Sequence, residues 1–159
     1  MKFVPYKERY FEDYAVGEVA EFGDYQVTEE EIVAFARAYD PQPFHLDAEA
    51  GRQSHFGGLV ASGWMTCSIV MRLYCDHFIP QVSAMGSPGI DALRWRLPVR
   101  PGDRLRARAT ILAARRSVSK PDRGVITLLQ EAVNQHGDTV VSYEGRAMFL
   151  CRSGGMEGS

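Results

Sequence analysis

The feature that most constrains the fold is an apolar helical segment in the middle of the chain, led into by Leu59–Thr66 and ending near Phe78. It spans about 25 Å at roughly 1.5 Å per residue. Its large apolar residues lie almost all round the helix: Trp64, Met65, Ile69, Val70, Leu73, Tyr74 and Phe78. A helix that is apolar on nearly all sides is normally buried, so we predict a buried central helix. Cys67 and Cys75 on this helix are predicted to be small buried residues.

The carboxyl-terminal half has strand periodicity, because apolar and polar side chains alternate from Pro88 onward. The expected strands are residues 19–27, 93–97, 105–111, 125–134 and 139–151. Each has one buried and one solvent face, and short turns join the later ones into an antiparallel meander. Such a sheet buries its apolar face by wrapping around the central helix. We therefore predict the α+β class and the hot-dog fold, an antiparallel β-sheet wrapped around a long central α-helix.

The length of 159 residues and the balance of 45% hydrophobic to 24% charged residues fit one globular domain. We expect residues 1–152 to form it and the Gly-rich residues 153–159 to be a disordered tail. A net charge of -2 argues against a nucleic-acid partner. No apolar run reaches the roughly 20 residues that span a bilayer, and the start lacks a signal-peptide core, so a cytoplasmic protein without a membrane partner is expected. The three cysteines show no metal-ligand spacing.

A candidate catalytic segment follows an amphipathic helix that opens with a capping box at Thr28. That helix is predicted to end at Asp40, because Pro41 disfavours helical angles in the residue before it. Asp40 and His45 then lie on a short loop stiffened by Pro41 and Pro43, and fixed geometry is what an acid–base pair needs. The spacing leaves a second interpretation open, in which Asp40 caps or pairs with the local backbone and His45 is a half-buried loop residue.

Several segments together resemble the MaoC-like family of hot-dog proteins, whose best-known activity is (R)-specific enoyl-CoA hydration. In that family an Asp-x-Asn-Pro-x-His segment follows a helix, and Ala-His-Gly or Ala-Ser-Gly opens the central helix. Asp40–His45 and Ala61–Gly63 stand in those places. Further similarity at residues 11–17, 56–60 and 93–103 extends the resemblance over nearly the whole chain.

The resemblance implies an enzyme, a hydro-lyase that adds water reversibly across the double bond of an acyl-CoA thioester: an (R)-specific enoyl-CoA hydratase or 3-hydroxyacyl-CoA dehydratase. Asp40 and His45 would hold the water and share the proton transfers. The Gly63 backbone N–H, free at the first turn of the central helix, would stabilise the enolate oxygen. No metal or other cofactor is implied, since the coenzyme A thioester is the substrate. The implied substrate-binding residues are Gln42, Phe44, Phe56, Gly58, Ser62 and Trp64.

Two residues depart from the family pattern: Gln42 stands where Asn is usual, and Ser62 where His is commoner. Both affect the expected choice of substrate. Two other functions stay open. A thioesterase on the same fold would use a carboxylate to activate water against the carbonyl carbon and would leave His45 without a clear need. A noncatalytic acyl-binding subunit could dispense with the Asp40 and His45 pair altogether.

Two further expectations concern partners. The open strand edges of such a sheet predict pairing with a second copy, as a homodimer or a dimer of dimers. A basic group in the predicted hairpin either grips the phosphates of coenzyme A or is ordinary solvent-facing charge. This group consists of Arg115, Arg116, Lys120 and Arg123.

Overall fold

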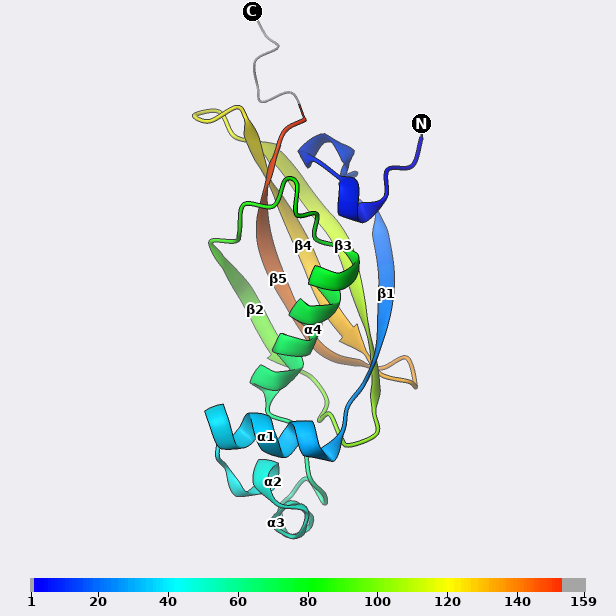
Figure 1. Cartoon of the computed structure of the whole chain (residues 1–159), viewed down its shortest axis with the longest axis vertical. Helices are drawn as coiled ribbons and strands as arrows, with labels where there is room; N and C mark the ends of the chain where they lie inside the picture. Colours follow the sequence, from blue (N-terminus) through cyan, green and yellow to red (C-terminus); the bar gives the residue numbers. More distant parts are fainter. Residues whose placement is uncertain (1, 153–159) are drawn as a thin grey trace, which may run out of the picture.

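A five-stranded antiparallel sheet curves along one long helix in the computed structural model, which describes residues 2–152 (Figure 1). The expected tail at 153–159 lies outside the described residues. The strands are β1 (Val19–Gln26), β2 (Gly89–Trp95), β3 (Arg104–Arg116), β4 (Arg123–Val133) and β5 (Thr139–Leu150). The helices are α1 (Glu29–Tyr39), α2 (Pro43–Leu46), α3 (Ala48–Gln53) and α4 (Gly63–His77), preceded by the 3₁₀ turns Tyr6–Glu8 and Phe11–Asp13. This arrangement confirms the predicted α+β hot-dog fold.

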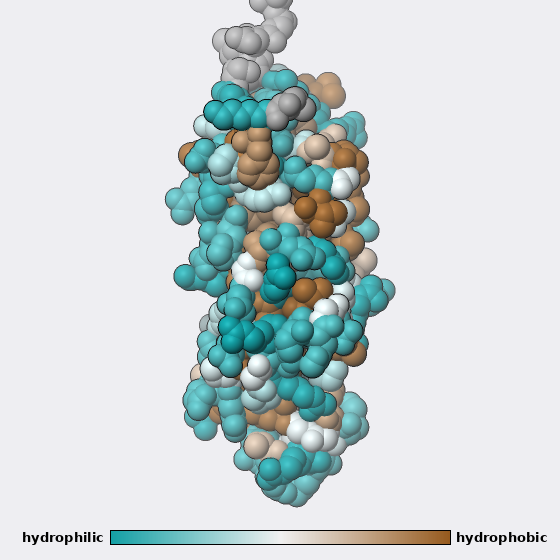
Figure 2. Space-filling view, turned by 90° about the vertical axis from the view of Figure 1, so that its right-hand side faces the viewer, coloured by the Kyte–Doolittle hydropathy of each residue, from teal (hydrophilic) through white to brown (hydrophobic). Residues whose placement is uncertain are grey.

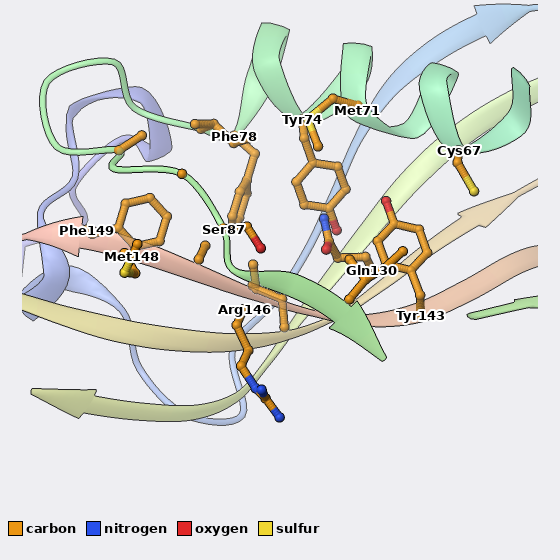
Figure 3. Close-up of a pocket in the computed structure, with 16 residues that line it drawn as sticks. Cys67, Met71, Tyr74, Phe78, Ser87, Gln130, Tyr143, Arg146, Met148 and Phe149 are labelled. Atoms are coloured by element: carbon orange, nitrogen blue, oxygen red, sulfur yellow. The ribbon is translucent and has the colours of Figure 1, made fainter. Parts of the chain in front are cut away.

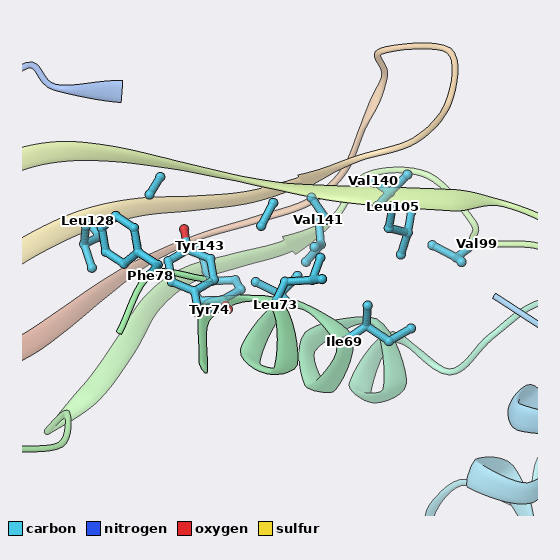
Figure 4. Close-up of a cluster of buried hydrophobic side chains, with 14 of the residues drawn as sticks. Ile69, Leu73, Tyr74, Phe78, Val99, Leu105, Leu128, Val140, Val141 and Tyr143 are labelled. Carbon is cyan, nitrogen blue, oxygen red and sulfur yellow. The ribbon is translucent and has the colours of Figure 1, made fainter. Parts of the chain in front are cut away.

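The core lies between α4 and the sheet (Figure 4). Ile69 and Leu73 on α4 face Leu105 on β3 and Val141 on β5, and all four side chains are buried. Burying one such side chain fully contributes roughly 1.5–3 kcal/mol. Within residues 2–152, no helix combines the length and the apolar character needed to cross a membrane.

The prediction that α4 is buried on all sides is wrong for one face. Trp64 is 55% exposed and Met71 47% exposed, and Cys75 is also exposed rather than buried. The sheet covers only one side of the helix, and the described chain leaves the opposite side open. Arg72 and Asp76 form an ion pair of 3.1 Å on this open side.

The strand order is β1-β3-β4-β5-β2, so the predicted meander is confirmed for β3, β4 and β5 and is wrong for β2. β2 pairs with β5, with Trp95 opposite Val141. The connection from β2 to β3 crosses the end of the sheet, where the Ala61 N–H donates to the Val99 carbonyl at 2.8 Å. Through this hydrogen bond, the connection between β2 and β3 is attached to the segment that leads into α4. The two strands therefore do not form a hairpin.

The two edges of the sheet differ in character. On the β1 edge, Glu21 and Asp24 pair with Arg106 and Arg104 of β3 at 3.6 and 2.7 Å. Figure 2 shows this side of the molecule, where hydrophilic residues occupy most of the surface. Charges on an edge strand discourage pairing with another chain. The β1 edge is therefore protected.

The β2 edge exposes apolar side chains. Ile90 and Trp95 are nearly half exposed, and Leu97, just beyond the strand, is also exposed. The predicted buried face of this strand is therefore wrong, since only Leu93 is partly buried. A strand face is buried only where another element packs on it. Within the described chain, α4 packs mainly on β1 and β3, so the apolar side chains of β2 stay exposed despite their alternation.

Candidate active site

The candidate site is built on the turn between α1 and α2. The capping box at Thr28 is present, and α1 ends at Tyr39, with Asp40, where Pro41 was predicted to stop the helix, as the C-cap whose N–H donates to the Ala36 carbonyl. Pro43 then opens α2, because its fixed φ suits the first helical position. The expected loop is therefore partly helical, and α2 turns the His45 side chain back toward Asp40.

The two candidate catalytic side chains meet. His45 Nε2 lies 3.3 Å from Asp40 Oδ2, and the His45 side chain is buried. The other ring nitrogen, Nδ1, lies 2.6 Å from the Val60 carbonyl oxygen. A carbonyl only accepts hydrogen bonds, so Nδ1 carries a proton and Nε2 is left to exchange protons at the site. This geometry favours the catalytic interpretation over that of a half-buried loop histidine.

Two side chains favour the charged form of Asp40. Gln42 Nε2 donates to Asp40 Oδ1 at 2.6 Å, and the Ser62 hydroxyl lies near the same carboxylate. Burial by itself would raise the pKa of Asp40, but these two side chains and the nearby His45 outweigh it and keep the pKa below its ordinary value. Asp40 is therefore a carboxylate at neutral pH, ready to accept a proton.

Ser62 is a positioning residue in this structure. Its side chain is fully buried, caps α4 by accepting from the Trp64 N–H at 3.2 Å, and supports Asp40. We expect Ser62→Ala to raise the pKa of Asp40, because the charged form loses a donor. The acid limb of the kcat/KM profile should then move to higher pH.

The control for this prediction is Thr28→Ala, which removes the N-cap of α1 but no contact of Asp40. Both variants should lose about 1 kcal/mol of folding stability. Only Ser62→Ala should move the pH profile of enoyl-CoA hydration. Equal profiles for the two variants would show that Ser62 acts on stability alone.

Gly63 begins α4, and its backbone N–H finds no partner among residues 2–152, as is usual in the first turn of a helix. The positive end of the helix lies behind this N–H and favours a developing oxyanion. A Cβ added at Gly63 would lie 2.4 Å from Cε2 of Trp95. Position 63 therefore requires glycine, because the Trp95 ring occupies the space that a Cβ would take.

A cavity of about 520 Å³ joins these groups, and we call it the site pocket. Seven of the residues expected from the sequence line it: Asp40, Gln42, Phe44, His45, Phe56, Gly63 and Trp64. The other two, Gly58 and Ser62, do not: Ser62 lies behind Asp40, and Gly58 lies against Arg100.

Sequence reasoning missed one wall of the site pocket. This wall is formed by Trp95, Arg96, Leu97, Pro98 and Val99. The Trp95 ring packs edge-on against Trp64, with 5.1 Å between ring centroids. The similarity to the MaoC-like family over residues 93–103 could have indicated this wall. The alternation of apolar and polar residues predicted only a strand there.

The basic hairpin group lies far from the site pocket. The turn between β3 and β4, which carries Lys120, is at the opposite end of the sheet from α1 and α2 (Figure 1). Arg123 pairs with Asp122 at 2.8 Å, and Arg116 donates to the Pro121 carbonyl. Within one chain, these residues do not contribute to the pocket that contains Asp40 and His45.

An antiparallel sheet curved around a helix defines a hot-dog protein, and an Asp–His pair lies at the amino end of that helix. The model of the MaoC-like domain matches residues 12–134. The chain belongs to the MaoC-like dehydratase family, and a hydro-lyase activity follows from the family at that general level.

Three relatives illustrate the similarity. The MaoC-like dehydratase from Rhodospirillum rubrum superposes with a TM-score of 0.85 at 41% identity, covering 91% of this chain and 98% of that one. The 3-hydroxyacyl-thioester dehydratase Z of Mycobacterium tuberculosis is 30% identical over 127 residues, 79% of this chain and 77% of the relative. The (R)-hydratase from A. caviae has a TM-score of 0.69 at 25% identity, covering 87% of this chain and 98% of that one.

Proposed function

We propose that the protein is an (R)-specific enoyl-CoA hydratase or 3-hydroxyacyl-CoA dehydratase, which adds or removes water at the double bond of an acyl-CoA thioester. The observation that carries this proposal is the pairing of Asp40 with His45 at 3.3 Å in a pocket that also contains the free N–H of Gly63. An acid–base pair and an oxyanion donor are the groups that hydration of an enoyl thioester requires.

In the proposed reaction, a water molecule donates hydrogen bonds to Asp40 Oδ2 and His45 Nε2. Its oxygen attacks the β-carbon, the electron pair of the double bond moves into the bond between the α-carbon and the carbonyl carbon, and the carbonyl electron pair moves onto the carbonyl oxygen to form an enolate. The Gly63 N–H donates to that oxygen. Asp40 and His45 take one proton from the water and return one to the α-carbon, so the pair ends each cycle unchanged. These steps use only groups of the chain and require no metal or redox cofactor.

The test follows the products formed from a panel of enoyl-CoA esters. Hydration removes the conjugated double bond and leaves the thioester intact, so the enoyl absorbance should fall without release of thiol. Release of free coenzyme A would instead identify a thioesterase. Binding of the esters without either change would identify a noncatalytic acyl-binding subunit. The contact of His45 Nδ1 with the Val60 carbonyl favours the hydratase, because it leaves Nε2 on the side of Asp40, where the proposed water binds.

The proposed assembly is a homodimer formed through the β2 edge. Exposed apolar side chains on that edge and on α4, including Ile90, Trp95 and Met71, lie on the side that the sheet of one chain leaves open. Burying such side chains against a second copy would be favourable. We expect sedimentation equilibrium to give twice the mass of one chain, and amide exchange to be slower on the β2 edge than on the β1 edge. A monomer would contradict this assembly.

A further inference from the structure

A second cavity, of about 320 Å³, lies along α4 beyond the site pocket, and we call it the inner cavity (Figure 3). Its walls come from α4, from β4 and β5, and from the segment that joins α4 to β2. Cys67 on its wall lies one helical turn beyond Gly63, about 6 Å along the helix axis. Trp95 lies on the wall of the site pocket, packs on Gly63 and is close to Cys67, so it stands between the two cavities.

The inner cavity is largely apolar, but it contains a hydroxyl that no protein group satisfies. Tyr143 on β5 is 4% exposed and lines the cavity. Among residues 2–152, its hydroxyl makes no hydrogen bond, and it points toward α4 between Tyr74 and Cys67 (Figure 3). The residue is buried, but its hydroxyl is open to the cavity, so it is free to donate a hydrogen bond to a polar atom of a ligand.

The neighbouring tyrosine hydroxyl is already occupied, because Tyr74 donates to the Arg108 carbonyl at 3.0 Å. Burial raises the pKa of Tyr143, so its hydroxyl stays protonated and acts as a hydrogen-bond donor. The complementary ligand atom at this position is therefore an acceptor.

The charge around the inner cavity decides which acceptor fits. Arg146 is the one cationic residue on the described lining, and its guanidinium pairs with Asp91 at 3.1 Å and points out of the cavity (Figure 3). A carboxylate beside Tyr143 would be buried without a counter-ion. A neutral oxygen, as in a ketone or a hydroxyl, meets the donor without that cost.

We propose that the inner cavity selects short enoyl thioesters whose acyl chain carries a neutral oxygen substituent, which accepts a hydrogen bond from Tyr143. The inference rests on the proposed hydratase function and deepens it. With the thioester carbonyl at Gly63, the acyl chain passes Trp95 and runs along α4, so the substituent reaches Tyr143 a few bonds beyond the double bond.

The experiment compares three α,β-unsaturated acyl-CoA esters of equal chain length. One is unsubstituted, one has a ketone in place of a methylene beyond the double bond, and one ends in a carboxylate. In the wild type, kcat/KM should be about tenfold higher for the ketone than for the unsubstituted ester, and lowest for the carboxylate. Tyr143→Phe should abolish the preference for the ketone. This variant loses an unpartnered hydroxyl, so its thermal stability should not fall.

The control is Tyr74→Phe, which removes a hydroxyl from the same cavity that is already bonded to the protein. It should keep the preference for the ketone at a temperature where it is folded. A wild type without that preference, or a preference that survives in Tyr143→Phe, would overturn the inference while hydration itself still stood. Absence of hydration with all three esters would overturn the proposed function and the inference together.

Discussion

Replacing Asp40 with Asn should reduce the rate of enoyl-CoA hydration by roughly a hundredfold to ten-thousandfold, the range that a general acid–base group contributes. Asn has nearly the shape of Asp and still accepts a hydrogen bond from Gln42, which lies 2.6 Å away. It cannot take a proton from water. The rate of loss of enoyl absorbance measures the effect, and circular dichroism with thermal unfolding shows whether the fold is kept.

The matched control is Asp47→Asn, seven positions along the same segment. Asp47 is exposed and caps α3 by accepting from the Ala50 N–H at 2.9 Å. Asn serves as an N-cap equally well, so this variant should keep both the stability and the rate of the wild type. If Asp40→Asn also kept the wild-type rate, Asp40 would not be part of the acid–base pair.

The second large effect is expected for Gly63→Ala. The new methyl group would collide with the Trp95 ring at 2.4 Å, so either the ring or the amino end of α4 must move. Misplacing the Gly63 N–H should cost roughly a hundredfold to a thousandfold in kcat, as removal of one oxyanion donor does in other enzymes. Single-turnover kinetics would assign this loss to the chemical step.

Gly124→Ala separates this effect from a general packing defect. Its Cβ would meet the Phe11 ring at 2.3 Å, a collision of the same kind on β4, outside the lining of the site pocket. Both variants should be destabilised, and only Gly63→Ala should lose activity at a temperature where both are folded. A loss of kcat in Gly124→Ala as large as that in Gly63→Ala would mean that the rate depends on global stability rather than on the donor.

Local sequence rules predicted the parts of the site that depend on neighbouring residues. The capping box at Thr28 and the proline at position 41 determined where α1 begins and ends. Asp40 and His45 are separated by only four residues that include two prolines, so few backbone arrangements were open to them. Their 3.3 Å contact is consistent with a constraint carried by one short segment.

Only the tertiary structure decided the contacts between distant segments. The proximity of Ser62 to Asp40, the packing of Trp95 on Gly63 and the position of Tyr143 beside α4 each depend on segments that are distant in the sequence and are brought together by the fold. Alternation and helical periodicity say which side of an element is apolar. They do not say which element lies next to it, because many strand orders bury the same apolar faces, and β2 pairs with β5 through contacts that no local pattern encodes.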